Sequence, residues 1–203
     1  MIASTPARLL CCCCVAALLT LAACAGAGLP PGFAAAAANA PEDWPLRLWL
    51  DGDHVVAAAA GVGPGGLPQA VRTSIDAVAP GGELQFAGRE WSAAGDGYRV
   101  DKRYVDGADE SFRSALIAAD GAVLERSHSV PIGKVPVAVL TAALTVGRDV
   151  RRCEIVADAA QETGWRATVV DGAGRSFVAM IGLQGGIRSV YRIVNARLGL
   201  LSR

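Results

Sequence analysis

The two histidines, His54 and His128, are the side chains best suited to catalysis or metal binding in this chain. His54 follows Asp51-Gly52-Asp53, a cluster that could supply metal ligands. A zinc site needs three or four converging ligands, however, and no other His or Cys lies near this turn in the sequence. The aspartates also lack the longer ligand series and the closing Glu of a calcium-binding loop. We therefore expect solvated carboxylates here and no bound metal.

His128 lies between two serines, in Ser127-His128-Ser129. A serine hydrolase needs a nucleophile on a strained turn and a base that an acidic partner holds in place. The sequence has no Gly-x-Ser-x-Gly segment, and no acidic residue stands at a position typical of a triad. We therefore predict that the chain is not an enzyme and uses no cofactor. A hydrolase that uses His128 is the alternative that we favour least.

The six cysteines do not form a disulfide framework, because five of them lie near the amino end. Four occupy residues 11–14 of an apolar run, Cys24 ends that run, and only Cys153 belongs to the part that should fold. A single cysteine cannot form an internal disulfide, so the fold must depend on its core. Cys153 could be a reactive thiol or pair between molecules. We favour a small buried residue on a strand, because free cysteine packs as a small hydrophobic side chain.

The amino end has the architecture of a bacterial export signal, which we assign to residues 1–23. Arg8 supplies a positive charge, and the apolar run that follows is shorter than the roughly twenty residues of a spanning helix. The run ends in Leu21-Ala22-Ala23-Cys24. This motif resembles the lipobox of bacterial lipoproteins, in which signal peptidase II cuts before the cysteine and the thiol receives a diacylglycerol. We expect Cys24 to be the lipid-attachment residue; ordinary secretion with cleavage after Ala25-Gly26-Ala27 is the alternative.

The predicted location is the cell envelope, where the lipid would hold the protein at the outer membrane or the periplasmic face of a two-membrane cell. Residue 25 is Ala and not Asp, which resembles the outer-membrane sorting class. Residues 24–43 comprise the lipidated cysteine and a stretch rich in Ala, Gly and Pro, so we expect a flexible tether. The formal net charge is zero, and this argues against a nucleic-acid partner.

Two segments of the remaining chain align with each other at a spacing of about 68 residues. Each begins at a proline, Pro68 or Pro136, which suits the first turn of a helix. Apolar residues then recur at helical spacing until a Gly-containing breaker. The two apolar stripes are Leu67, Val71, Ile75 and Val78 in the first copy, and Val135, Val139, Ala143 and Val146 in the second.

Four strand-like stretches follow each expected helix. Turns rich in Gly or containing Asp-Gly separate them, and such turns favour tight hairpins. The alternation of apolar and charged residues is clearest in 98–104, where it indicates a half-buried strand. The expected strands are 83–91, 98–104, 112–119 and 123–130 in the first copy, and 150–157, 165–170, 177–183 and 187–194 in the second.

These elements predict an α+β fold with two tandem repeats, each a helix followed by a four-stranded antiparallel sheet. The helix should cover one sheet face and leave the other to solvent or a partner. The preceding hairpin could add strands to one sheet edge. The expected divisions are 44–65 for the extra β-hairpin and linker, 66–130 for the first repeat, 131–194 for the second repeat and 195–203 for a C-terminal tail.

The order of these motifs resembles the PepSY and PepSY-like domains, a group that includes β-lactamase-inhibitor-like proteins. The second copy departs from the pattern, because it has no Pro-Gly after its helix and no Asp-Gly before its last strand. The resemblance implies an extracytoplasmic protein that binds or inhibits other proteins, and it carries over no catalytic residue. The matching segments are Leu67-Pro68, Pro80-Gly81-Gly82, Gly97 to Val100, Asp106-Gly107 and Ala119 to Leu124, with Val135-Pro136, Gly164-Trp165, Asp171-Gly172 and Gly186-Ile187 in the second copy.

Five residues on the expected strands are candidates for partner binding. Arg99, Arg103 and Arg166 could decorate the open sheet face and meet an acidic partner, although a solvated face balanced by neighbouring carboxylates is the interpretation that we favour. Trp91 and Trp165 could anchor an interface, because exposed tryptophans often do so. Packing in the core or at a sheet edge is the commoner use of such residues.

The sequence therefore predicts an exported, membrane-anchored and non-catalytic protein-binding module. Its partner would be an extracytoplasmic protein, and inhibition of an extracytoplasmic hydrolase is the narrowest form of this hypothesis. The alternative is a structural envelope lipoprotein without a specific soluble target.

Overall fold

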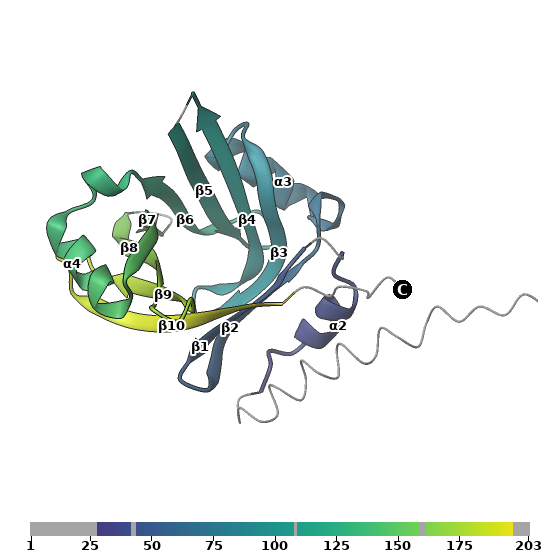
Figure 1. Cartoon of the computed structure of the whole chain (residues 1–203). Coiled ribbons are helices and arrows are strands. Elements are labelled where there is room, and N and C mark those ends of the chain that lie inside the picture. Colours follow the sequence, from purple (N-terminus) through teal and green to yellow (C-terminus); the bar gives the residue numbers. More distant parts are fainter. Residues whose placement is uncertain (1–27, 42–43, 108, 159–160, 197–203) are drawn as a thin grey trace, which may run out of the picture.

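Ten antiparallel strands form one closed sheet, with three helices packed on its outside (Figure 1). This computed structural model describes residues 28–41, 44–107, 109–158 and 161–196. The helices are α2 (Phe33–Ala38), α3 (Gln69–Val78) and α4 (Val137–Val146), and the two 3-10 turns are η1 (Pro64–Gly66) and η2 (Ile132–Lys134). The strands are β1 (Leu46–Asp51), β2 (His54–Gly61), β3 (Glu83–Ser92), β4 (Gly95–Asp106), β5 (Asp109–Ile117), β6 (Val123–Val130), β7 (Asp149–Ala157), β8 (Glu162–Val170), β9 (Ser176–Ile181) and β10 (Ile187–Ala196).

The predicted fold class, two tandem units with a four-stranded sheet each, is wrong. The strands instead form a single barrel in the order β1-β10-β9-β8-β7-β6-β5-β4-β3-β2. β6 pairs with β7 over five residue pairs, which joins the two expected four-stranded units into one sheet, an arrangement that the sequence had left open. The backbone groups of unpaired edge strands would otherwise need water or another partner, and closure of the sheet satisfies them internally.

The amino-terminal hairpin closes the barrel. We expected it to extend one sheet edge, but β1 pairs with β10, the last strand, while β2 pairs with β3. The register sets Leu48 opposite Val194 in β10 and Ala58 opposite Trp91 in β3. The two halves of the chain are therefore paired at two junctions, β6 with β7 and β1 with β10.

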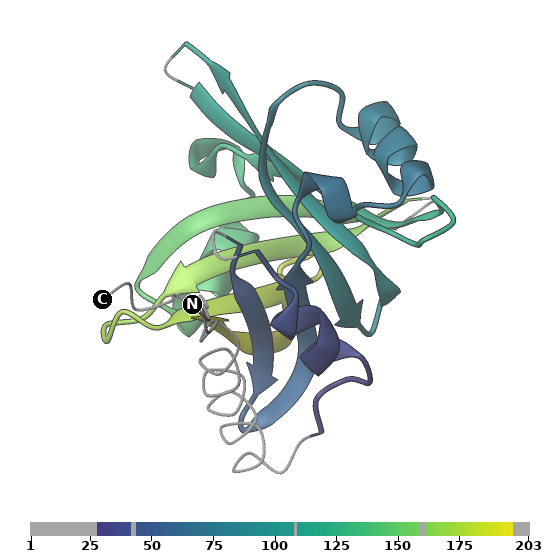
Figure 2. The ribbon, with the colours of Figure 1, turned by 90° about the vertical axis from the view of Figure 1, so that its right-hand side faces the viewer.

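The helices lie outside the barrel because each has an apolar side to bury. Val71 and Ile75 of α3 are buried against β3, β4 and β5, and Val139 and Ala143 of α4 are buried against β7, β8 and β9. Both helices begin directly after a proline, as their sequences predict. Figure 2 shows α2 and α3 on the outer surface of the sheet. The three apolar clusters thus lie between the sheet and the helices.

Part of the expected tether is folded. Residues 33–38 form α2, whose Phe33 and Ala37 pack against β1 and β2. The Phe33 ring meets Trp91 edge-on at a centroid distance of 5.7 Å. A six-residue helix would not persist alone, so this packing accounts for the difference from our expectation. The export signal of residues 1–23, the lipid-attachment residue Cys24 and most of the C-terminal tail lie outside the described residues.

Within the described ranges, no helix is both long enough and apolar enough to span a membrane.

Candidate functional site

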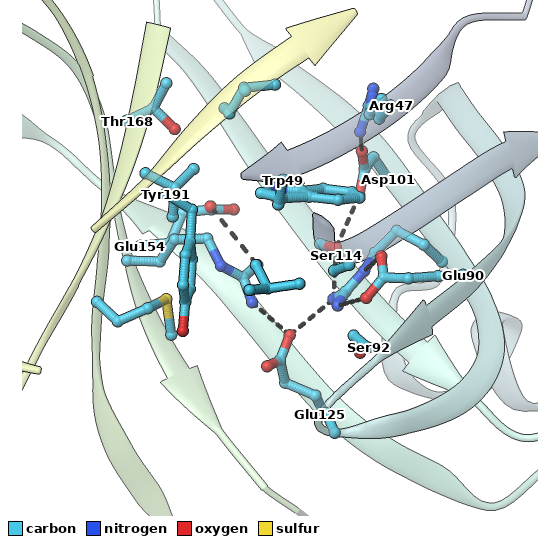
Figure 3. Close-up of a pocket in the computed structure, with 18 of the residues that line it drawn as sticks. Arg47, Trp49, Glu90, Ser92, Asp101, Ser114, Glu125, Glu154, Thr168 and Tyr191 are labelled. Carbon is cyan, nitrogen blue, oxygen red and sulfur yellow. Dashed lines mark hydrogen bonds and ion pairs between the residues drawn. The ribbon is translucent and has the colours of Figure 1, made fainter. Parts of the chain in front are cut away.

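The inner surface of the barrel carries several charged and aromatic side chains of the strands. Residues along a strand alternate between the two sheet surfaces. On β4, for example, Tyr98 and Val100 belong to the cluster under α3, whereas Arg99 and Asp101 face inward. The inward-facing residues surround a pocket of about 660 Å³ (Figure 3). This volume is in the range of small-ligand sites in proteins.

Ion pairs fill one side of this pocket. Arg99 on β4 donates from Nε and Nη2 to both carboxylate oxygens of Glu90 on β3, at 2.9 and 2.8 Å. Burial disfavours the charge of Arg99, yet Glu90 and its other acidic neighbours raise its pKa. Asp101 accepts a 2.9 Å bond from Arg47 and a 2.7 Å bond from the Ser114 hydroxyl. Burial opposes ionisation of Asp101, but Arg47 and Arg99 lower its pKa.

Glu125 on β6 connects the two halves of the barrel. Its Oε1 accepts a 2.7 Å bond from Nη1 of Arg99 in the first half and a bond from Nη2 of Arg166 in the second (Figure 3). Burial works against the carboxylate, but Arg166 and Arg99 together lower the pKa of Glu125 to about 2. A charged Glu125 therefore stabilises the folded barrel at neutral pH.

Glu154 on β7 is surrounded less tightly. It is 1% exposed and accepts a 3.2 Å bond from the Ser127 hydroxyl. Two guanidinium groups approach it only at ion-pair distance, with Nε of Arg152 at 3.7 Å and Nη1 of Arg166 at 4.0 Å. The buried Nε of Arg152 has no hydrogen-bond partner among the described residues, and its guanidinium lies 4.9 Å from the centre of the Phe112 ring. On this side of the pocket, the Nε–H of Arg152 therefore has no described acceptor.

Aromatic and hydroxyl groups line the remaining wall. The strand register aligns Arg152 of β7 with Thr168, Val178 and Tyr191 of the next three strands. All four face the pocket, and Trp49 of β1 joins them from the closing hairpin. Figure 3 shows the Trp49 and Tyr191 rings beside the ion-pair network. The pocket thus combines a charged side with a partly apolar one.

The structure brings together only two of the five predicted partner-binding residues. Arg99 and Arg166 both line the pocket and share Glu125. Arg103 lies outside the pocket lining and is held by Glu83 and by Glu110, the latter at 3.2 Å. Neighbouring carboxylates balance these arginines, but Arg99 is only 7% exposed, so this surface is not the solvated face that we favoured.

The two candidate tryptophans are packing residues. Trp91 is 4% exposed and lies under α2, and Trp165 is 6% exposed and lies under α4. Both rings point to the outer surface of the sheet, because the alternation that turns Glu90 and Arg166 inward turns their neighbours outward. Neither ring is free to anchor a partner.

Several pocket residues were not among our candidates, namely Trp49, Glu125, Glu154, Thr168 and Tyr191. Period-two alternation would have assigned Glu125, Glu154 and Tyr191, each within its own strand, to one of the two sheet surfaces. What the sequence did not indicate is that these sides face one another across a closed interior. Trp49 was missed because its hairpin was expected at an edge.

The residues considered for chemistry lie away from this pocket. His54 is exposed at the start of β2, and no group of three His, Cys, Asp or Glu side chains able to hold a metal occurs among the described residues. His128 is exposed on β6, beside a second cavity of about 440 Å³ between the end of α3 and β5 to β7. Cys153 is fully buried on β7, as expected, and burial and Glu154 raise its pKa to about 11.

Comparisons with known proteins give distant likenesses. No protein-family model matches the chain, PepSY models included, and no curated protein matches it. One similar solved structure is a Bacteroides eggerthii protein provisionally described as periplasmic, with 13% identity, a TM-score of 0.44 and coverage of 62% of this chain and 88% of that one. Another is a BLIP-like protein from Bacteroides fragilis, with 18% identity, a TM-score of 0.40 and coverage of 68% and 92%. Likenesses of this size define neither the family nor the function of the chain.

Proposed function

We propose that this chain is an exported, lipid-anchored and non-catalytic binding module, and that it holds a segment of a partner protein in the pocket inside its barrel. The observation that carries the proposal is the pocket itself. Its wall combines Trp49 and Tyr191 with several arginines on a closed sheet. Tyr, Trp and Arg are the residue types that most often dominate binding energy at protein interfaces.

The arrangement of the two sheet surfaces supports this assignment. Three helices cover apolar clusters on the outer surface, so those side chains are already used in folding. The inner surface has no such cover and keeps polar groups that can reach a ligand. Because the strands are paired all the way round, these groups are held on a rigid scaffold, which lowers the entropic cost of binding.

The narrower hypothesis, inhibition of an extracytoplasmic hydrolase, rests only on the resemblance in sequence to β-lactamase-inhibitor-like proteins. The export signal and Cys24 support a location outside the cytoplasm. The alternative function, a structural envelope lipoprotein, needs no pocket, and a binding experiment separates the two.

The test is crosslinking of the tagged full-length chain in the cells that produce it, followed by mass spectrometry of the captured proteins. We expect one dominant extracytoplasmic protein. The inner-surface substitutions Trp49→Ala and Tyr191→Ala should each reduce its recovery at least about tenfold, since each removes a large aromatic contact. Arg192→Ala is the matched control, because Arg192 is exposed and follows Tyr191 on the same strand but faces the other way.

Equal capture by the wild type and by both aromatic variants would overturn the proposal. Recovery of abundant envelope proteins alone, unchanged by the substitutions, would favour the structural lipoprotein. The thermal unfolding of each variant should be measured alongside, so that a loss of folding is not mistaken for a loss of binding.

A further inference from the structure

Three of the four carboxylates of the pocket accept arginine hydrogen bonds, whereas two of its arginines, Arg152 and Arg188, donate none to a described carboxylate. Five arginines and four carboxylates line the pocket. Asp101, Glu90 and Glu125 each accept at least one arginine hydrogen bond shorter than 3.0 Å. A cationic ligand would have to displace an arginine from one of these three carboxylates. The fourth, Glu154, is 1% exposed, accepts from the Ser127 hydroxyl and lies within 4.0 Å of both Arg152 and Arg166. The pocket is therefore better prepared for a negative group than for a positive one.

The unused donors belong to Arg152 and, on another part of the pocket wall, to Arg188. The Nε of Arg152 makes no hydrogen bond within the described part of the chain, and its contact with Glu154 is a 3.7 Å ion pair. The Nε atom is buried, but the Arg152 side chain as a whole is 34% exposed and lines the pocket, so a ligand would contact the guanidinium through its Nη atoms. Arg188 of β10 also lines the pocket and forms no ion pair with any described residue. Two of the guanidinium groups that line the pocket thus retain N–H donors that no described carboxylate accepts.

A hydroxyl and an apolar wall stand beside these donors. Thr168 is the direct cross-strand neighbour of Arg152, and its hydroxyl makes no hydrogen bond within the described residues (Figure 3). Val178 and Tyr191 continue the same row across the sheet, and Trp49 faces the pocket from β1. The Arg152 guanidinium lies 4.9 Å from the Phe112 ring, toward β5, whereas Thr168 lies on β8, the neighbour of β7 on the other side. Both residues line the pocket, so a carboxylate that enters between them can accept from both, and the rings of Trp49 and Tyr191 suit an apolar body attached to it.

We infer that the pocket recognises a carboxylate carried on an aromatic or aliphatic group, with Arg152 and Thr168 holding the carboxylate and Trp49 and Tyr191 contacting the apolar part. This inference rests on the proposed function and specifies its ligand. In a partner protein, the group is an acidic side chain next to an aromatic residue. A free aryl carboxylic acid has the same chemistry.

The test is titration calorimetry of the full chain in detergent with two matched pairs of probes. The first pair is acetyl-Phe-Glu-amide and acetyl-Phe-Gln-amide, and the second is 3-phenylpropionate and its amide. We expect the carboxylate of a pair to bind at least about tenfold more tightly than the amide, because a charge-assisted bond to Arg152 is lost in the amide. Arg152→Gln should remove this preference, and Thr168→Val should weaken it.

Arg151→Gln is the control variant. Arg151 precedes Arg152 on β7 but is exposed and paired with Asp149, so its loss should leave the carboxylate preference unchanged. Arg152→Lys retains the charge and should retain part of the preference. Thermal unfolding of every variant shows that the barrel is intact.

Equal binding of carboxylate and amide by the wild type, or an unchanged preference in Arg152→Gln, would overturn the inference. The proposed function would still stand if Trp49→Ala and Tyr191→Ala reduced partner capture while Arg152→Gln did not. Binding of 3-phenylpropionate without the peptide would support the carboxylate site and assign it to a free acid, which would count against the partner protein.

Discussion

Glu125 is the residue through which the charges of the two barrel halves interact. Its replacement by Gln would leave Arg99 with only Glu90 and Ser114 and leave Arg166 with a 4.0 Å contact to Glu154. We expect Glu125→Gln to lower the free energy of unfolding by about 3 kcal/mol. The reason is that Arg166 would lose its only hydrogen-bonded carboxylate among the described residues, and an unpaired buried charge is costly. Chemical denaturation measures this change. Glu110→Gln is the control, since its ion pair with Arg103 is exposed and should contribute less than about 1 kcal/mol.

The same carboxylate predicts how stability depends on pH. Folding lowers the pKa of Glu125 from its usual value near 4.5 to about 2. A depressed folded-state pKa contributes stability that is complete above about pH 4.5 and is lost as the pH falls toward 2. The wild type should lose about 3 kcal/mol from this group over that window, and Glu125→Gln should lose correspondingly less. Parallel pH profiles for the two proteins would contradict the role assigned to Glu125.

Cys153 should be inert in the folded protein. Its side chain is fully buried and its pKa is raised to about 11, so the reactive thiolate is scarce at neutral pH. We expect an alkylating reagent to modify Cys153 only after denaturation, as peptide mapping by mass spectrometry would show. Rapid modification of Cys153 in the native protein would instead indicate an accessible, reactive thiol.

At the level of elements, local signals predicted positions well. Pro68 and Pro136 located the starts of α3 and α4, and period-two alternation located the strands to within a few residues. The segment before β1 was the exception. Its Ala-rich composition indicated a flexible chain, and nothing local showed that Phe33 would find a site beside Trp91. A short helix of this kind depends on tertiary contacts, which the sequence pattern does not contain.

The docking of α2 can be tested through Phe33, which is 2% exposed. Phe33→Ala should destabilise the protein by about 3 kcal/mol, because it removes a buried ring and leaves a cavity against β1 and β2. The fluorescence of Trp91 should shift toward that of a solvated indole. Ala34→Ser, at the exposed neighbouring position, should leave both stability and fluorescence unchanged. A Phe33→Ala variant with wild-type stability would mean that α2 does not contribute to the folded barrel.

For the whole molecule, closure of the sheet is what the sequence could not reveal. The pairing of β1 with β10 joins residues nearly 150 positions apart, such as Leu48 and Val194, and the alternation within each strand is compatible with an open sheet as well. The pocket depends on this closure, because Trp49 and Tyr191 line one cavity only when the hairpin returns to the last strand. Arg99 and Arg166 could be named as candidates, but their shared cavity could not.

Hydrogen exchange tests the closed topology. Because 46–50 pair with 192–196, the amides of these two segments should be protected about as well as those of the central strand β4. Two separate sheets would leave edge strands whose outward amides exchange quickly. Rapid exchange throughout β1 and β10, with protection elsewhere, would contradict the barrel.

The central claim is that the partner is bound inside the barrel, and site-specific photocrosslinking tests it most directly. A photoreactive amino acid is placed at Tyr191, which faces the pocket, and in a separate chain at Arg72, which is exposed on the outer side of α3. We predict that the Tyr191 position forms a covalent adduct with one extracytoplasmic protein in living cells and that the Arg72 position does not. An adduct with that protein from Arg72 and none from Tyr191 would show that the barrel binds its partner by the outer surface, and the proposed site would be wrong.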